Sequence, residues 1–321
     1  MPDRTSDGGL GGFYEELLGS EMAPLWEVLD RNRAPRPVTV PHRWAWSDVE
    51  PLLRRAGELV TAEEAERRVL MLVNPATKGD KRAVGNLYAG IQLILPGETA
   101  RAHRHTAAAL RFVLRGEGAL TVVDGVAVHL SPFDLVVTPS WAWHDHVNGT
   151  AHPMVWLDAL DSPLTRALDA WFFDPHPTGL QEPGDDPARE AALTYPWAPV
   201  HSAAVAAAAA SDEGAAAIAY THPATGADVL PTTRCQVVTV AAGGRWGPQR
   251  RVGGAVFCVA EGRGTAAVGP ATFPLAFGDV FCVPSWCPLE ISNDGGDPLS
   301  LFTYDDEPVL RAFGLERSEP A

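Results

Sequence analysis

Several stretches of the chain alternate between apolar and polar residues with the two-residue period of a β-strand. Within residues 86–95, Tyr88, Gly90 and Gln92 fall on one face and apolar residues fall on the other. Short glycine-containing segments such as Asp124-Gly125 separate these stretches and predict hairpin turns. The pattern favours a mainly β protein in which antiparallel strands form a barrel.

Other stretches predict helices that flank the strands. Apolar residues recur at helical spacing from Phe13 to Leu29, and we expect an amphipathic helix, broken before Pro24, that covers a barrel or a subunit interface. The segment Thr61-Ala62-Glu63-Glu64 fits a capping box at the start of a short helix. The alanine-rich run at 203–210 also favours a helix.

The second half of the chain repeats the first. His105-Thr106-Ala107-Ala108-Ala109 aligns with Arg251-Val252-Gly253-Gly254-Ala255, and Pro139-Ser140-Trp141 aligns with Pro284-Ser285-Trp286. We therefore expect two copies of one barrel in a single chain. The expected domains are an N-terminal helical and extended segment that packs on the barrels (1–85), a first barrel (86–173), a linker with an alanine-rich helix (174–215) and a second barrel (216–321).

Three histidines of the first repeat are candidates for a metal site. His103 and His105 stand two residues apart in an alternating segment, so both imidazoles point to the same side of a strand. His144 follows the turn-like Pro139-Ser140-Trp141. Imidazole suits iron, zinc, copper and nickel. We predict that the first barrel is catalytic and binds a metal through His103, His105 and His144.

The second repeat lacks these residues. It carries Gln249, Arg251 and Leu289 where the first repeat has its three histidines. Arginine stays protonated and leucine has no donor atom, so neither can bind a metal. We expect the second barrel to hold no metal and to be structural.

Composition narrows the possible partners and the location. The formal net charge is −15 and no block of basic residues stands out, which argues against nucleic acid and anionic membranes as partners. No apolar run of about 18 residues occurs, and the first residues contain no apolar signal segment. The four cysteines form no CxxC pair and are expected to be reduced thiols. We expect a cytoplasmic protein.

Four residues near the histidines are candidates for catalysis, namely Arg111, His146, Gln92 and Asp158. Arg111 has the same strand parity as His103, and a buried arginine beside a cation implies a substrate carboxylate held by its guanidinium. The alternative is a salt bridge to Asp158. His146 has the parity of His144 and could be a fourth ligand, a hydrogen-bond partner of the site or a proton relay, of which we favour the last two.

Further residues are expected to face the same space. The expected substrate contacts, besides Arg111, are Tyr88, Gly90, Gln92, Trp156 and Arg67. Gln92 could donate to a substrate hydroxyl or to oxygen, or it could only satisfy backbone groups. Asp158 could orient His146 or Arg111. For Arg67 and its neighbour Arg68, a place at the pocket mouth and a solvated or interfacial role both stay open.

The HxH pair, followed by a P-x-x-x-x-H segment that ends near an asparagine, resembles the cupin barrel. Cupins usually carry a glutamate a few residues after HxH, but here the segment is Ala107-Ala108-Ala109-Leu110. Three neutral imidazoles leave the charge of a divalent metal uncompensated, which favours a chelating dianion as the next ligand.

A longer series of segments resembles the gentisate 1,2-dioxygenase family, which includes salicylate and 1-hydroxy-2-naphthoate dioxygenases. The shared segments are PLWEVL (24–29), RAGELVTAEEAERRVLMLVNP (55–75), LYAGIQLILPGE (87–98), AHRHTAAALRFVLRGEGALTVVDG (102–125), TPSWAWHDHVN (138–148), WLDALDSPL (156–164), YTHPATGADVLPT (220–232) and PVLRAFGL (308–315). The resemblance covers nearly the whole chain. It implies an all-β dominated bicupin, with two double-stranded β-helix (jelly-roll) barrels and flanking helices.

The same resemblance implies an activity and a cofactor. One Fe(II) per chain would be bound by His103, His105 and His144, O2 would be the co-substrate, and Arg111, Gln92, His146 and Asp158 would contact or support the substrate. The family usually forms tetramers, so a homotetramer or a homodimer is expected. In the second repeat, where relatives often keep an HRHT-like remnant, this chain has QRRV (249–252).

The implied reaction is cleavage of gentisate (2,5-dihydroxybenzoate) between its carboxyl-bearing and hydroxyl-bearing carbons to give maleylpyruvate. Salicylate, substituted salicylates and 1-hydroxy-2-naphthoate stay open as substrates, because one or two wall residues change such a preference by only ~1–3 kcal/mol. A metal-dependent isomerase or hydrolase and a non-catalytic, ligand-binding cupin are the other classes. Strict dependence on O2 would distinguish a dioxygenase from the isomerase or hydrolase. A turnover assay would distinguish an enzyme from the non-catalytic cupin.

Overall fold

The computed structural model describes residues 7–29, 33–77 and 79–321. The chain divides into two compact units, residues 1–36 and residues 37–321. The first unit contains α1 (Asp7–Gly19) and α2 (Leu25–Val28). Within it the Trp26 indole donates to the Tyr14 hydroxyl (3.1 Å), which in turn donates to Glu27 (3.0 Å). The expected helix with a break before Pro24 is confirmed, and its packing on a barrel or a subunit interface stays a prediction.

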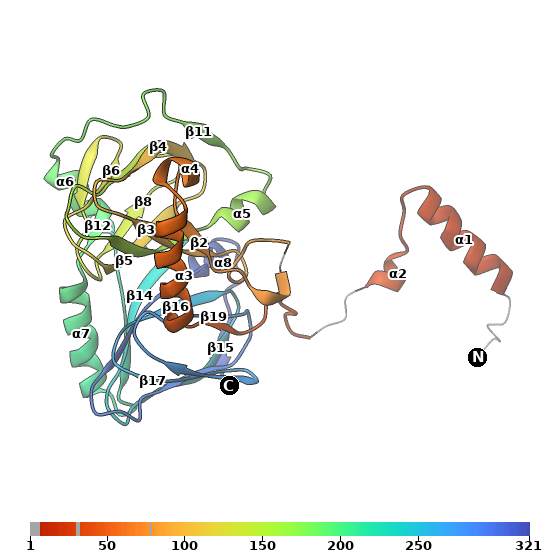
Figure 1. Ribbon diagram of the computed structural model, residues 1–321. Helices are drawn as coiled ribbons and strands as arrows, with labels where there is room; N and C mark the ends of the chain where they lie inside the picture. Colours follow the sequence, from red (N-terminus) through yellow and green to blue (C-terminus); the bar gives the residue numbers. More distant parts are fainter. Residues whose placement is uncertain (1–6, 30–32, 78) are drawn as a thin grey trace. The chain divides into compact units, whose positions relative to one another are not determined.

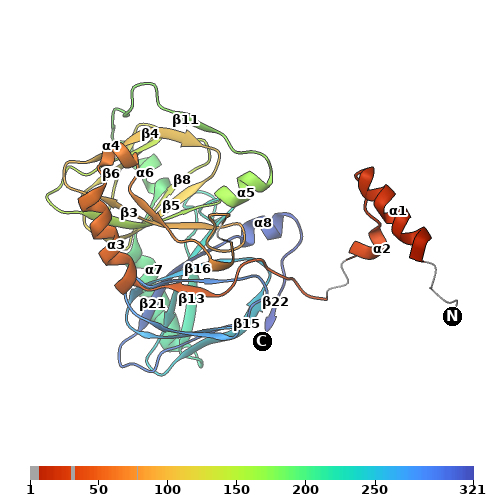
Figure 2. The ribbon, with the colours of Figure 1, turned by 45° about the vertical axis from the view of Figure 1, so that its right-hand side comes forward.

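The second unit contains two barrels, each built from two antiparallel sheets (Figures 1 and 2). The strands of the first barrel are β2 (Val69–Met71), β3 (Tyr88–Ile94), β4 (Thr99–His105), β5 (Ala109–Arg115), β6 (Leu120–Val123), β7 (Val126–His129), β8 (Leu135–Thr138), β9 (His144–Val147), β10 (Met154–Leu160), β11 (Phe173–Pro175) and β12 (Thr194–Tyr195). They form the sheets β12-β8-β5-β10-β3-β2 and β11-β4-β9-β6-β7. These strands are yellow, orange and green in Figure 1.

The second barrel repeats this arrangement. Its strands are β1 (His42–Trp44), β13 (Ala215–Ala219), β14 (Arg234–Val240), β15 (Arg245–Arg251), β16 (Ala255–Glu261), β17 (Gly264–Val268), β18 (Ala271–Leu275), β19 (Val280–Val283), β20 (Leu289–Ser292), β21 (Leu299–Asp305) and β22 (Ser318–Pro320). The sheets are β1-β19-β16-β21-β14-β13 and β18-β17-β20-β15-β22. The bicupin fold expected from the sequence is therefore confirmed.

Corresponding turns show how closely the halves match. The barrel strands end in α5 (Ser162–Ala167) in the first half and in α8 (Glu307–Ala312) in the second. Just before these helices, Asp161 accepts a hydrogen bond from the Ala108 backbone N–H (2.9 Å), and Asp306 accepts one from the Gly254 N–H (2.9 Å). The same carboxylate therefore satisfies the same backbone donor in both barrels, and the two can be compared position by position.

The segment from 37 to 85 joins both barrels. Its strand β1 pairs with β19 of the second barrel, and β2 pairs with β3 of the first. Between them α3 (Trp46–Leu59) packs on β3, and the Trp46 backbone N–H donates to Asp279 (2.8 Å). The short helix α4 (Ala62–Ala65) starts with the expected capping box between Thr61 and Glu64, and a single 3-10 turn follows at Pro75–Thr77.

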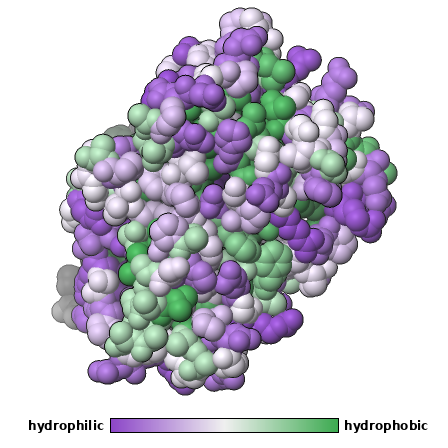
Figure 3. All heavy atoms as spheres, turned by 90° about the vertical axis from the view of Figure 1, so that its left-hand side faces the viewer, coloured by the Kyte–Doolittle hydropathy of each residue, from purple (hydrophilic) through white to green (hydrophobic). Residues whose placement is uncertain are grey.

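Half of the connection between the barrels (174–215) is helical. It contains α6 (Pro187–Leu193) and α7 (Trp197–Ala210), so the alanine-rich helix begins before residue 203. Figure 3 shows the side of the molecule that lies to the left in Figure 1, where small hydrophobic patches alternate with hydrophilic residues. In the described ranges no helix combines the length and the apolarity needed to cross a bilayer. The sequence-based domain boundaries stay predictions.

The barrels pack against each other through apolar faces of two sheets. Phe112 on β5 and Phe302 on β21 are fully buried and stack with ring centroids 4.3 Å apart and planes 6° apart. Cys235, Cys258 and Cys282 are buried in the same core, and all four cysteines are free thiols. The sheet of the first barrel that contains β5 thus packs against the sheet of the second barrel that contains β21.

Replacing Phe302 with alanine should lower the free energy of unfolding by about 3–5 kcal/mol, because a buried ring is lost and a cavity is left between the barrels. Chemical denaturation followed by tryptophan fluorescence measures the change. The matched control is Phe313→Ala, since Phe313 is 66% exposed and its loss should cost less than about 0.5 kcal/mol. Equal effects of the two substitutions would contradict the packing described here.

Candidate metal centre and substrate pocket

The three candidate ligands come from two paired strands. His103 and His105 lie on β4, and His144 opens β9, where it is paired directly with His103. All three side chains are buried, and one nitrogen of each lies within 4.8 Å of those of the other two. Strand pairing alone therefore brings together residues that are about 40 positions apart in the sequence.

Hydrogen bonds orient two of the imidazoles for metal binding. His105 Nδ1 lies 2.8 Å from the carbonyl oxygen of Ala107, and His144 Nδ1 lies 3.0 Å from that of Ala142. A neutral imidazole that donates from Nδ1 keeps a lone pair on Nε2, which is the usual arrangement at metal sites. These residues fit a divalent metal ion.

Burial also keeps the imidazoles neutral. It lowers the pKa of His105 to about 4, and together with the nearby Arg67 charge it lowers the pKa of His103 to about 2. The pKa of His144 is lowered too, by burial and by His103 beside it. A metal ion therefore does not compete with protons for these nitrogens near pH 7.

The third imidazole has a different neighbour. The Arg67 guanidinium contacts Nδ1 of His103 and donates to the backbone carbonyl of Arg101 (2.7 Å). Arg67 lies between the inner cavity and an outer hollow of about 700 Å³, because it lines both. Arg68 points elsewhere and is paired with Glu98 (2.8 Å). Of the two arginines, the structure thus brings Arg67 to the pocket.

A cavity of about 240 Å³ opens beside the three histidines. Most of the residues predicted from the sequence line it, namely Arg67, Tyr88, Gln92, His103, His105, Arg111, His144, His146 and Asp158. They come from β3, β4, β5, β9 and β10 and from the segment before β2. The roles assigned to them stay predictions, but their common location is a feature of the structure.

Arg111 and Asp158 form an incomplete ion pair in the cavity wall. The Arg111 Nε and the Asp158 Oδ1 are 3.9 Å apart, and neither atom has a hydrogen-bond partner among the described residues. One guanidinium nitrogen, Nη1, donates to the Thr138 hydroxyl (2.7 Å). Burial lowers the pKa of Arg111 and raises that of Asp158, with each charge opposing the shift of the other. The salt-bridge alternative thus accounts for only part of the hydrogen-bonding capacity of Arg111.

Two further polar groups are poised at the cavity. The side-chain amide nitrogen of Gln92 is buried without a partner among the described residues. His146 Nδ1 lies 2.9 Å from the Thr121 hydroxyl, and His146 is not in the group of three histidines that could hold a metal. Burial, and then the Arg111 charge, lower its pKa, so it is a neutral base. The geometry favours the non-ligand roles expected for His146.

The remaining predicted contacts lie in the wall. A side chain at Gly90 would place its Cβ 2.6 Å from Val69 Cγ1 and 2.7 Å from the Tyr88 hydroxyl, so only glycine leaves room for both. Trp156 is fully buried behind His146, with ring centroids 5.1 Å apart, and it does not line the cavity. The geometry therefore favours a packing role for Trp156 over a direct substrate contact.

Sequence reasoning missed the aromatic residues that cover the histidines. Trp171 lines the cavity and stacks on His105, with ring centroids 5.7 Å apart, and Phe173 on β11 lies 5.2 Å from the His103 ring. Arg166 on α5 also lines the cavity and lies over the Trp171 ring, 4.3 Å from its centroid. The only sequence signal is the aromatic run Trp171-Phe172-Phe173 directly after the α5 segment.

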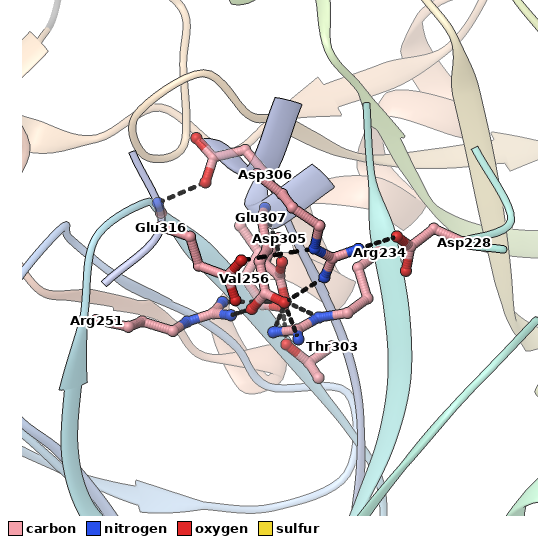
Figure 4. A network of polar contacts seen from close by, with 11 residues as sticks. Asp228, Arg234, Arg251, Val256, Thr303, Asp305, Asp306, Glu307 and Glu316 are labelled. Carbon is pink, nitrogen blue, oxygen red and sulfur yellow. Dashed lines mark hydrogen bonds and ion pairs between the residues drawn. The ribbon is translucent and has the colours of Figure 1, made fainter. Parts of the chain in front are cut away.

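The corresponding region of the second barrel is filled by charged and apolar side chains. Arg251, at the position of His105, is paired with Asp305 (3.0 Å) and Glu307 (3.2 Å). Arg234, at the position of Tyr88, is paired with the same two acids (2.9 and 2.6 Å). Figure 4 shows both arginines converging on these carboxylates.

Apolar residues replace the polar ones deeper in this barrel. Phe257 stands at the position of Arg111, and Leu289 and Ile291 stand at those of His144 and His146. All three are buried in one apolar cluster. That the second barrel holds no metal stays a prediction, and these residues are consistent with a structural role.

Comparison with known proteins relates this site to a family. Residues 90–160 match the cupin domain. The chain is 38% identical to a gentisate 1,2-dioxygenase from Streptomyces sp, with 99% of this chain and 98% of the relative covered, and 36% identical to a 5-aminosalicylate 1,2-dioxygenase from Comamonas sp, with 97% and 90% covered. The crystal structure of a salicylate 1,2-dioxygenase from Pseudoaminobacter salicylatoxidans with gentisate superposes with a TM-score of 0.90 at 32% identity, covering 100% of this chain and 95% of that one. The resemblance noted in the sequence is confirmed, and the chain belongs to the gentisate 1,2-dioxygenase family of ring-cleaving dioxygenases.

Proposed function

We propose that this protein cleaves gentisate with O2 between the carboxyl-bearing and hydroxyl-bearing carbons to give maleylpyruvate, and that its metal is Fe(II). Both oxygen atoms of O2 end in the product, so no other oxidant or reductant is needed. The observation that carries the proposal is a buried arginine with an unused donor beside three metal-competent histidines in one cavity. A cytoplasmic location and a homodimer or homotetramer are further proposals that rest on the sequence.

The metal would be held by His103, His105 and His144. When bound, Fe(II) supplies a redox-active centre that lets the electron-rich ring react with O2. Three neutral imidazoles contribute no negative charge, which favours a substrate that brings two, such as the carboxylate and the ionised ortho hydroxyl of a 2-hydroxybenzoate. The absence of a carboxylate ligand in this group thus supports the substrate class.

Arg111 would bind the substrate carboxylate and orient the ring. Its guanidinium donates to Thr138 through Nη1, and its Nε faces Asp158 at 3.9 Å without a hydrogen bond, so Nε keeps a proton to donate. A carboxylate would supply the acceptor that this buried group lacks and would neutralise a cation placed next to a metal. Fixing the ring in this way lowers the entropic cost of reaching the reactive geometry.

His146 would accept the proton of the substrate's ortho hydroxyl. Thr121 fixes the orientation of the ring through Nδ1, and the lowered pKa leaves the imidazole unprotonated before substrate binds. Gln92 would donate its unpaired amide proton to a substrate hydroxyl or to O2. Tyr88 lines the same cavity and is the candidate for recognising the 5-hydroxyl of gentisate.

Salicylates are the second candidate substrates, because relatives at 32–36% identity are named for salicylate and 5-aminosalicylate. Anaerobic loading with Fe(II), followed by O2 and one substrate at a time, distinguishes the candidates. We expect one O2 consumed for each ring-fission product with gentisate, and much slower uptake with salicylate and 1-hydroxy-2-naphthoate. No uptake with gentisate, despite bound iron, would refute the proposal.

Removing one ligand should abolish metal binding by the first barrel. His144→Ala should reduce the bound iron from about one per chain to a small fraction after dialysis, since two imidazoles do not hold a divalent ion against water. Elemental analysis measures the content without reference to activity. The control is His152→Ala, an exposed histidine in the loop after β9, which should keep its full metal content.

Removing the guanidinium of Arg111 should weaken productive binding. We expect Arg111→Ala to lower kcat/KM for gentisate by roughly 100-fold or more, in line with the 2–5 kcal/mol found when one partner of a buried charge pair is lost. The matched control on the same strand is Arg115→Ala, since Arg115 is partly exposed and paired with Glu50. An unchanged kcat/KM in Arg111→Ala would remove Arg111 from the mechanism.

A further inference from the structure

We propose that Tyr304 of the second barrel is a positioning residue for the substrate pocket of the first. Its hydroxyl holds Tyr88 in place, and through Tyr88 it sets how strongly the pocket prefers a ring that carries a 5-hydroxyl. The inference rests on the proposed function, because it assigns the selectivity of the same pocket.

The contact is a single hydrogen bond across the barrel interface. The Tyr304 hydroxyl donates to the backbone carbonyl of Tyr88 with a distance of 2.7 Å, and Tyr304 is only 1% exposed. Tyr304 and Phe302 stand two apart on β21, so both face the first barrel. Because Phe302 stacks on Phe112, the strand that carries the Tyr304 hydroxyl is itself fixed against the first barrel.

The side chain of Tyr88 has little freedom to compensate for a backbone shift. Its hydroxyl lies so close to Gly90 that a single added Cβ would come within 2.7 Å of it. The phenol also lines the cavity, on the same strand face as Gln92. Burial, and then the Asp158 charge, raise the pKa of Tyr88, so the phenol keeps its proton and can donate to a substrate hydroxyl. A small movement at the start of β3 would therefore move this donor relative to the bound ring.

The matching positions of the two barrels do not form a second, equivalent hydrogen bond. The first-barrel counterpart of Tyr304 is Ala159, which has no hydroxyl to offer. The second-barrel counterpart of Tyr88 is Arg234, whose side chain is paired with Asp305 and Glu307 instead. The structural barrel thus supports the catalytic one at the pocket wall, without a reciprocal contact.

The test compares two ligands that differ only at the 5-position. Dissociation constants of gentisate and salicylate are measured anaerobically with the Fe(II)-loaded, full-length protein, so no turnover is required. Tyr304→Phe removes the hydroxyl and leaves a buried carbonyl without this donor, and we expect the preference for gentisate over salicylate to fall about 10-fold. The preference should not fall further when Tyr304→Phe is added to Tyr88→Phe, because both changes act through the Tyr88 hydroxyl.

Tyr220→Phe is the matched control. Tyr220 is also 1% exposed in the same core, but its hydroxyl has no hydrogen-bond partner among the described residues. This variant should keep the wild-type preference and a similar unfolding temperature.

An unchanged preference in Tyr304→Phe, or an equal loss of affinity for both ligands, would overturn the proposal, since a merely structural role weakens both alike. Failure of the wild type to bind gentisate would instead refute the proposed function, and it would be seen before any variant is made.

Discussion

The site depends on the antiparallel pairing of β4 with β9. This pairing places His144 directly opposite His103, while the two-residue period of β4 brings His105 to the same side. A shift of one residue would turn the histidines of one strand to the other face and leave no three-nitrogen group. On its other side β9 pairs with β6, where His144 lies opposite Val123. Asp124 and Gly125 with positive φ (46° and 80°) close the hairpin between β6 and β7.

Buried polar groups distinguish the first barrel from the second. In the first barrel Arg111, Asp158 and Gln92 each keep a buried atom without a partner among the described residues, which costs stability unless a ligand supplies the missing bond. In the second barrel the corresponding positions are Phe257, Thr303 and Val238, and they are buried. In one barrel the fold therefore leaves buried polar groups without partners, where a ligand could bind them. In the other barrel it fills the same space with packed side chains.

In the second barrel, Arg251 stands at the position of His105 and belongs to a group of ion pairs. Arg251 is only partly buried, whereas His105 at the matching position is buried. Burial lowers the pKa of Arg251, while the Asp305 and Glu307 charges raise it by more. A lone buried arginine would be strongly destabilising, so the acids at 305 and 307 are needed once position 251 is an arginine. The network of Figure 4 thus shows how an arginine at this position is balanced by neighbouring carboxylates.

Local periodicity predicted the antiparallel strands and most of the residues of the cavity, while the two barrels followed from the internal repeat and the family resemblance. It placed His103, His105 and Arg111 on one face, because that inference needs only the alternation along a strand. It could not choose between Arg67 and Arg68, since adjacent residues point to opposite sides and the choice depends on how β2 pairs with β3. It also missed Thr121 and Thr138, whose contacts with His146 and Arg111 cross between strands. Trp171 was missed because it reaches His105 from a segment outside the barrel strands.

Trp156 shows a different limit of reasoning from parity. It pairs with Gln92 and has the parity of Asp158, so alternation alone puts it in the pocket. In the structure the His146 ring lies beside it, and the indole is completely buried. Parity gives the side of the sheet, but the size of neighbouring side chains decides which residues reach the cavity. Here the large ring of Trp156 is the packing surface that, with Thr121, holds His146 at the cavity.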